Sequence, residues 1–312
     1  RMENCLLQPY GLDRKRKNQA VYQITQAIMF VSDNRVSSAK TYFFEALAPS
    51  FSNSECKSMW ATVLSSHFGW SSSEILLHAN AKFSESDLLL IRNVVKRLQK
   101  HEPFQYIIGT VYFADLNLKI DRRALIPRPE TEELIDLLTK QGQTFAHILD
   151  LCTGSGCIAL ALKKKFPDAV VKGLDLSSDA ISLAKENAAQ LKLDVAFENS
   201  DIFDSEVLGS FDLIVSNPPY IPFEDQHQMQ ANVLDYEPHL ALFVPDHDPL
   251  LFYKQIIKIA QNSLLSSGFL ALEIHENYAL QTKALFEGKG YQTVQIYTDL
   301  QGKQRMILAQ KS

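Results

Sequence analysis

A short apolar run that leads into a glycine-containing loop and then a helical segment constrains the fold of this chain more than any other feature. The run covers residues 147–151, the helix is expected to begin near Cys157, and the loop between them is Cys152-Thr153-Gly154-Ser155-Gly156. Glycine tolerates positive φ and lets a ligand approach the backbone, while the first turn of a helix offers unpaired N–H groups. A tight strand-to-helix turn has the same pattern, so the residues that follow decide between a structural and a ligand-binding loop.

A second apolar run, 169–174, ends at Asp175, about twenty residues beyond the glycine loop, where an α/β nucleotide site places the acid that binds a ribose diol. Asp175 is alternatively an N-cap for the helix expected over 179–191, although Ser177 and Ser178 can cap that helix instead. The loop and the acid together favour a nucleotide-binding α/β sheet.

A third strand, expected over 194–198, leads to Asp201 and Ile202, which in this architecture border the exocyclic amine and the ring face of an adenine. The third glycine of a dinucleotide fingerprint is missing, because Leu160 stands where the helix would pack on the strand. This departure disfavours NAD as the ligand.

A fourth apolar run, 211–216, ends in Asn217-Pro218-Pro219-Tyr220. Proline lacks an N–H and has a fixed φ, so the Asn217 side-chain amide and the Pro218 carbonyl can face a ligand as fixed acceptors. Hydrogen bonds from a planar NH2 group to these acceptors would favour pyramidalisation and aim the nitrogen lone pair at an electrophile without a general base. Tyr220 is expected to stack on that group as a lid. The alternative is a proline-rich turn with Tyr220 packed on the core.

The cofactor pattern and the tetrapeptide together favour S-adenosylmethionine, whose sulfonium methyl would lie beside Asn217 at the carboxyl ends of the strands. With these motifs the chain resembles the PrmC/HemK family, the protein-(glutamine-N5) methyltransferases that modify the glutamine of the Gly-Gly-Gln loop in peptide chain release factors and so support translation termination. Besides 217–220, the matching stretches within residues 39–312 are 102–109, 126–132, 148–156 and 266–273.

The resemblance implies a class I methyltransferase domain, Rossmann-like with seven strands, behind a small N-terminal helical domain joined by a β-hairpin. It implies catalytic roles for Asn217, Pro218 and Tyr220, and acceptor binding by these residues and Pro219. The implied cofactor-binding set is Cys152, Thr153, Gly154, Ser155, Gly156, Asp175, Asp201, Ile202 and Asn217. S-adenosyl-L-homocysteine would be the product, and no metal is expected. The family commonly has glycine where Cys152 stands and often an aromatic residue where Ile202 stands, so both positions bear on cofactor affinity.

Four segments are expected: an extension over 1–36, a helical substrate-recognition domain over 37–110, a β-hairpin linker over 111–127 and the methyltransferase domain over 128–312. Helical spacing recurs over 21–31, 56–68, 72–78, 84–98, 250–265 and 278–287, and the strands expected near the end cover 268–274, 293–298 and 304–309.

Two stretches border the expected site. Residues 126–131 open the first helix of the catalytic domain, with Pro129 near position N1; alternatively, Arg128 and Thr131 face the methionine end of the cofactor. Residues 221–248 are expected to form a loop over the site, which Glu237 helps to order.

Composition limits the classes of function. A length of 312 residues suits two domains, and 46% hydrophobic with 21% charged residues is typical of a globular protein. The net charge of −5 and the lack of a long basic stripe argue against nucleic acid as the main partner. The four cysteines show neither a disulfide framework nor metal-ligand spacing, and no membrane span or signal peptide is evident. A cytoplasmic monomer that meets release factors transiently is expected.

Two rival functions remain open. Adenine N6 and guanine N2 are also planar NH2 groups, so a nucleic-acid amino methyltransferase could use the same tetrapeptide. Cys152 in place of the family's glycine motivates the second rival, a cofactor-binding scaffold without catalysis. The acidic charge balance argues against the first rival, and the intact Asn217 against the second.

Overall fold

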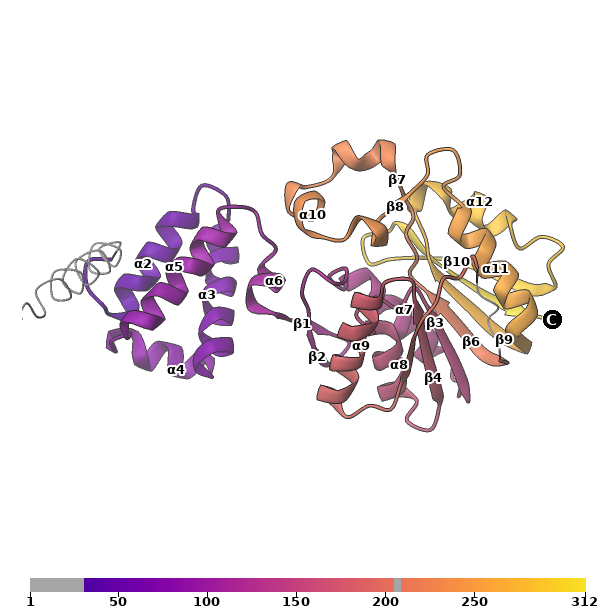
Figure 1. Ribbon diagram of the computed structural model, residues 1–312, viewed down its shortest axis with the longest axis horizontal. Helices are drawn as coiled ribbons and strands as arrows, with labels where there is room; N and C mark the ends of the chain where they lie inside the picture. Colours follow the sequence, from indigo (N-terminus) through magenta and orange to yellow (C-terminus); the bar gives the residue numbers. More distant parts are fainter. Residues whose placement is uncertain (1–30, 205–208) are drawn as a thin grey trace, which may run out of the picture. The chain divides into compact units, whose positions relative to one another are not determined.

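The computed structural model describes residues 31–204 and 209–312, so the helical pattern over 21–30 and most of the expected extension 1–36 lie outside the described residues. The chain divides into two compact units, one up to Ile108 and one from Gly109 to Ser312 (Figure 1).

The first unit is helical and has its own core. Its helices are α2 (Val36–Leu47), α3 (Asn53–Phe68), α4 (Ser72–Leu77), α5 (Glu85–Leu98) and α6 (Phe104–Ile108). The helices expected in this region are confirmed, but α3 begins three residues before the predicted Cys56, because Ser52 and Glu55 form a capping box that sets its start. Equivalent serine boxes start α4 and α5. Phe43, Trp60 and Ile91 are buried at the centre of this unit.

The second unit begins with a β-hairpin, β1 (Thr110–Phe113) and β2 (Leu116–Lys119), which buries Phe113, Leu116 and Leu118 in its main core. The hairpin linker was predicted over 111–127, but its strands end at Lys119. The reason is a turn in which the Ala124 N–H donates to the Asp121 carbonyl.

A seven-stranded sheet dominates the second unit, in the order β10-β11-β9-β6-β3-β4-β5. Its strands are β3 (His147–Leu151), β4 (Val170–Asp175), β5 (Ala196–Asn199), β6 (Phe211–Ser216), β9 (Leu264–Glu273), β10 (Tyr291–Thr298) and β11 (Gln304–Lys311). All neighbours from β9 to β5 are parallel, whereas β11 runs antiparallel between β9 and β10. The predicted seven-stranded Rossmann-like class is therefore confirmed. Strand β9 begins at Leu264, earlier than the predicted residue 268, because it follows its preceding helix without a loop.

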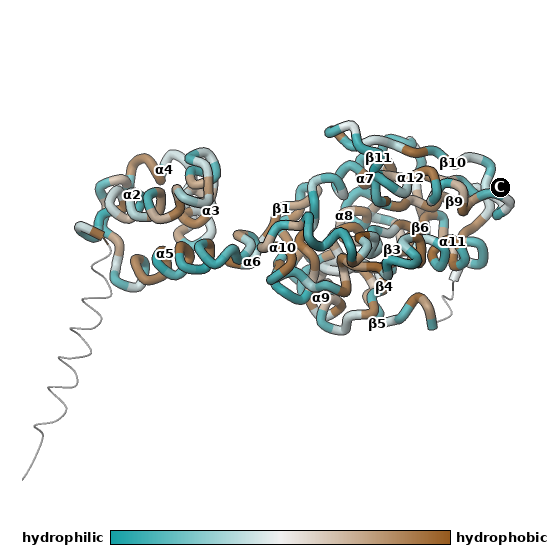
Figure 2. Tube along the Cα trace, turned by 90° about the horizontal axis from the view of Figure 1, so that it is seen from above, coloured by the Kyte–Doolittle hydropathy of each residue, from teal (hydrophilic) through white to brown (hydrophobic). Residues whose placement is uncertain are grey.

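Helices cover both faces of this sheet. Ile148 on one face packs with α7 (Pro129–Lys140), α8 (Cys157–Lys165) and α9 (Ser178–Leu191), while Leu149 on the other face packs with α11 (Leu251–Ser263) and α12 (Ala279–Ala284). Because side chains of a strand alternate between faces, this double cover explains why the central strand β6 is largely apolar without alternation. Figure 2 shows these hydrophobic stretches in the interior of the unit.

The segment over 221–248 crosses back from β6 to α11 and is drawn in orange in Figure 1. It was expected to be a loop, and it contains only short elements: β7 (Ile221–Pro222), η2 (Phe223–Gln228), α10 (Ala231–Tyr236), η3 (His239–Ala241) and β8 (Phe243–Val244). Strands β7 and β8 pair in parallel, so the two ends of the segment are fastened together. Within the described residues, no helix has both the length and the apolarity that crossing a bilayer requires.

Candidate active site

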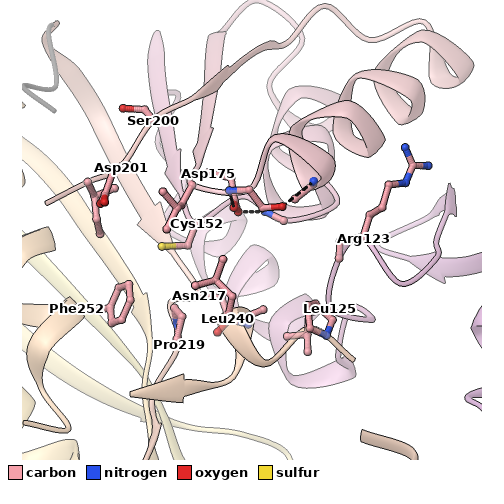
Figure 3. A pocket seen from close by; sticks show the side chains of 18 of the residues that line it. Arg123, Leu125, Cys152, Asp175, Ser200, Asp201, Asn217, Pro219, Leu240 and Phe252 are labelled. Atoms are coloured by element: carbon pink, nitrogen blue, oxygen red, sulfur yellow. Dashed lines mark hydrogen bonds between the residues drawn. The ribbon is translucent and has the colours of Figure 1, made fainter. Parts of the chain in front are cut away.

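A cavity opens at the carboxyl edge of the sheet, where β3, β4, β5 and β6 end (Figure 3). Apolar walls with a few convergent polar groups are typical of a small-molecule site. The predicted site residues that line it are Cys152, Gly154, Asp175, Asp201, Ile202, Asn217 and Pro219. The predicted residues outside the lining are Thr153, Ser155, Gly156, Pro218 and Tyr220.

Asp175 is fixed at the end of β4 by two backbone groups. Its Oδ2 accepts from the Gly154 N–H at 2.8 Å and its Oδ1 from the Ser177 N–H at 2.9 Å, as the dashed lines in Figure 3 show. Burial raises the pKa of this carboxyl, and the two hydrogen bonds oppose that shift. Each oxygen keeps a free lone pair, so the carboxylate can accept from two hydroxyl groups of a ligand.

The glycine loop combines two cavity-lining residues, Cys152 and Gly154, with residues that lie outside the lining. Cys152 adopts a positive φ of 61°, and its sulfur is directed into the space bordered by Phe252 and Asn217 (Figure 3). Gly156 has a φ of 80°, and a Cβ there would lie 2.8 Å from the Phe197 ring, so glycine is required at this position.

Asp150, the fourth residue of β3, forms hydrogen bonds that hold the glycine loop. It was not predicted from the sequence as a site residue. Its Oδ2 accepts from the Thr153 hydroxyl at 2.6 Å and from the Ala159 N–H at 3.1 Å, which joins the loop to α8. Its Oδ1 is buried and has no partner among the described residues. Burial raises the pKa of Asp150 to about 7, while the same two hydrogen bonds act in the opposite direction. An acid inside an apolar strand is the sequence signal that could have identified it.

The wall around Asp201 and Ile202 is more aromatic than the sequence indicated. Ile202 is buried, and Phe203 beside it meets Phe252 of α11 edge to face, with 5.2 Å between ring centroids. Both phenylalanines line the cavity. No local pattern marks Phe252, because it reaches the site only through the packing of α11 on the sheet.

The residues of the tetrapeptide after β6 have different surroundings: some line the cavity and others do not. Asn217 and Pro219 line the cavity and Pro218 does not, although both prolines are buried. The Tyr220 hydroxyl donates to Glu273 Oε1 at 3.0 Å, and its ring meets His275 edge to face at 5.9 Å. Tyr220 is thus held at its hydroxyl by the end of β9.

Asn217 belongs to a hydrogen-bonded chain that reaches β9. Its Nδ2 donates to Thr131 Oγ1 at 3.2 Å, and the Thr131 hydroxyl donates to Glu273 Oε2 at 2.6 Å. Thr131 and Glu273 are both buried. Thr131 is one of the two residues for which the sequence left open a role at the helix start or one facing the cofactor. In the structure it contacts the tetrapeptide.

Arg128, the other of those two residues, contacts the segment over the site instead. The buried carboxylate of Glu237 accepts from Arg128 Nη2 at 2.7 Å and from the Ile126 N–H at 3.1 Å. These contacts are the ones expected of a residue that helps to order the segment. The residues that follow it, Pro238, Leu240 and Ala241, form part of the cavity wall.

The lining fits S-adenosylmethionine. A carboxylate with free lone pairs suits a ribose diol, the Ile202 side chain with two aromatic rings suits an adenine face, and Asn217 stands on the opposite wall with an amide. In the described parts of the chain, no three His, Cys, Asp or Glu side chains gather in a way that could hold a metal ion.

Two protein-family models match parts of this chain. Residues 53–109 match the PrmC N-terminal domain and residues 129–236 match the methyltransferase small domain. The chain is 37% identical over 280 residues to the release factor glutamine methyltransferase of Bacteroides thetaiotaomicron, covering 89% of this chain and 100% of that protein. It is 42% identical over 228 residues to the release factor glutamine methyltransferase of Lactococcus lactis, covering 72% and 84% respectively.

Among solved structures, the catalytic domain of hMettl16 in complex with MAT2A 3′UTR hairpin 6 aligns with a TM-score of 0.50, over 74% of this chain and 82% of that one. At 14% identity this likeness concerns the fold alone.

Proposed function

The chain belongs to the release factor glutamine methyltransferase family, and we propose that it transfers a methyl group from S-adenosyl-L-methionine to the side-chain amide nitrogen (N5) of the glutamine in the Gly-Gly-Gln loop of a peptide chain release factor. One observation carries the proposal. Asn217, at the end of β6, borders the same cavity as Asp175, so an amide-binding group and a diol-binding group share one site.

On the acceptor side, the Asn217 side-chain oxygen and the Pro218 carbonyl accept the two N–H groups of the glutamine amide. These hydrogen bonds hold the nitrogen in place and reduce the conjugation of its lone pair with the amide carbonyl. Pro219 and Tyr220 border the acceptor amide. As the nitrogen–methyl bond forms and the sulfur–methyl bond breaks, one of the two amide hydrogens is released as a proton to water.

On the cofactor side, Asp175 receives the ribose hydroxyls, Asp201 and Ile202 border the adenine, and the loop over 152–156 lies against the nucleoside. When bound, S-adenosylmethionine supplies a methyl group on a sulfonium that departs as a neutral thioether. Phe203 and Phe252 supply the aromatic surface that the family often places at position 202.

The test is to incubate the protein with labelled S-adenosylmethionine and, separately, an unmethylated release factor, its Gly-Gly-Gln→Gly-Gly-Ala variant, total RNA and DNA. Label on the wild-type factor alone is expected. Label on the alanine variant would move the reaction to another residue, and label on RNA or DNA would replace the amide acceptor with a base.

The protein is further proposed to act in the cytoplasm, where release factors work, and as a monomer. Sedimentation at micromolar concentration checks the monomer, which a dimer would contradict.

A further inference from the structure

We propose that Thr131 and Glu273 are positioning residues that fix the orientation of the Asn217 amide, so that its oxygen, rather than its NH2 group, faces the acceptor. This inference rests on the proposed function, in which Asn217 accepts an N–H of the glutamine amide. An asparagine side chain has two ends of nearly equal shape and opposite polarity. If it were rotated by half a turn, it would present NH2 to NH2 and repel the acceptor.

The number of hydrogens that Thr131 and Glu273 can donate decides which end of the Asn217 amide faces Thr131. The ionised Glu273 carboxylate can only accept, and it does so at both oxygens, from Thr131 at 2.6 Å and from Tyr220 at 3.0 Å. A threonine hydroxyl has one hydrogen, and Glu273 takes it. Thr131 Oγ1 can therefore only accept from Asn217, which must turn its NH2 group toward it, at 3.2 Å.

The amide oxygen then lies at the other end of the Asn217 side chain. Within the described residues no group donates a hydrogen bond to Asn217 Oδ1, and the side chain borders the cavity. The oxygen is thus left for a ligand, while the NH2 group is committed to the protein. With Glu273 ionised, the hydrogen-bonding capacity of Thr131 and Glu273 alone sets this orientation of the Asn217 amide.

The direction of the chain depends on the charge of Glu273. A protonated Glu273 could donate to Thr131, which would free the threonine hydrogen to donate to Asn217 and favour the opposite amide orientation. Burial raises the pKa of Glu273, whereas the hydrogen bonds from Thr131 and Tyr220 and the positive charge of Arg305 lower it. Burial is the largest of these influences and the charge of Glu130 adds to it, so the pKa of Glu273 lies above its ordinary value; the two donated hydrogen bonds and Arg305 are the features that stabilise the carboxylate the hydrogen-bonded chain requires.

A purely structural role is the competing explanation, because Thr131 is buried near the start of α7. Two variants separate the explanations. Thr131→Val keeps the shape and removes the acceptor oxygen, whereas Thr131→Ser keeps the hydroxyl and removes a methyl group. Thr139→Val is a matched control, since Thr139 lies on the same helix and its hydroxyl donates only to the Ile135 carbonyl of that helix.

In steady-state assays, Thr131→Val is expected to lower kcat about 10- to 100-fold, the usual effect of removing a group that orients a ligand-binding side chain. The KM for the release factor should change by less than about 3-fold, and Thr131→Ser and Thr139→Val should stay close to wild type. Equal losses in the valine and serine variants would mean that packing matters, and an unchanged kcat in Thr131→Val would overturn the proposal.

A measurement without turnover keeps this test independent of the proposed function. The 15N side-chain NH2 signal of Asn217, assigned by its loss in Asn217→Ala, reports its hydrogen bond in the wild-type protein. Thr131→Val should shift this signal and speed its exchange with water, and Thr139→Val should not. If the wild-type protein methylates no release factor but the signal responds as expected, the proposed function fails and the orienting contact stands. An unchanged signal in Thr131→Val overturns the contact itself.

Discussion

Arg128 and Glu237 lie 109 residues apart in sequence, and their side chains form an ion pair with 2.7 Å between Nη2 and Oε1. The Glu237 carboxylate is 1% exposed and the Arg128 side chain 32%. This pair holds the segment over 221–248 against the residues that precede α7, at the point where Pro238 and Leu240 line the cavity.

Arg128→Ala should leave the Glu237 carboxylate buried with only the Ile126 N–H, and destabilise the protein by about 2 kcal/mol, less than a fully buried pair because Arg128 is partly exposed. It should also weaken S-adenosylhomocysteine binding, since the cavity wall loosens. Urea unfolding and calorimetry measure the two effects. Lys254→Ala removes an exposed pair with Asp248 of the same length, 2.7 Å, and should cost less than about 1 kcal/mol. Similar losses in both variants would refute the distinction.

Substitutions on the two walls of the cavity should separate turnover from cofactor binding. Asn217→Ala removes an acceptor for the glutamine amide and should lower kcat about 100-fold or more, with little change in the Kd of S-adenosylhomocysteine. Asp175→Ala removes the carboxylate proposed to bind the ribose diol and the acceptor of the Gly154 and Ser177 N–H groups, so it should raise that Kd first, by about 10-fold or more. Wild-type turnover with unchanged KM in Asn217→Ala would exclude its proposed role.

The left-handed backbone at Cys152 predicts that glycine is better tolerated there than alanine. Its φ of 61° costs a residue with a Cβ about 1 kcal/mol relative to glycine. Cys152→Gly and Cys152→Ala both remove the thiol, so their difference isolates the backbone term. The glycine variant should be more stable by about 1 kcal/mol in urea unfolding. An alanine variant of equal or greater stability would contradict this account.

Asp150 predicts a pH dependence of stability. Its pKa is raised from 3.8 to about 7 in the folded protein, so folding favours the protonated form. Its contribution is complete below pH 3.8 and is lost as the pH rises through about 7. Asp150→Asn stays neutral, and its oxygen can still accept from Thr153 and Ala159. The free energy of unfolding of wild type relative to this variant should therefore fall as the pH rises from about 4 to about 7 and level off above that. Parallel pH profiles would show that Asp150 is not the responsible group.

The sheet and the cofactor wall were predictable from the sequence for one physical reason. Cys152, Asp175, Asp201 and Asn217 each follow an apolar strand within a few residues, and parallel strands bring their carboxyl ends to one edge. The position of these four residues at the edge of the sheet could therefore be predicted from the strand beside each of them. The parallel core strands were recognisable because double burial makes them apolar throughout.

The remaining contacts depend on side chains that meet only in the folded chain. Thr131 and Glu273 are 142 residues apart, and neither is adjacent to Asn217 in sequence. Phe252 enters the cavity from a helix whose pattern indicates only that one face is apolar. The same limit applies to Tyr220, for which the sequence allowed both a lid and a core residue, and whose hydroxyl contact with Glu273 required the structure of β9.

The sheet order divides the site at β3. Cys152 and Asp201 follow β3 and β5 and Asp175 ends β4 on one side, whereas Asn217 follows β6 and Glu273 ends β9 on the other. Substitutions around β6, β9 and the start of α7 would therefore alter the side proposed to bind the methyl acceptor and leave in place the side proposed to hold the nucleoside. A lineage that changed its acceptor in this way would keep the glycine loop and Asp175 and would diverge first around Thr131 and Glu273.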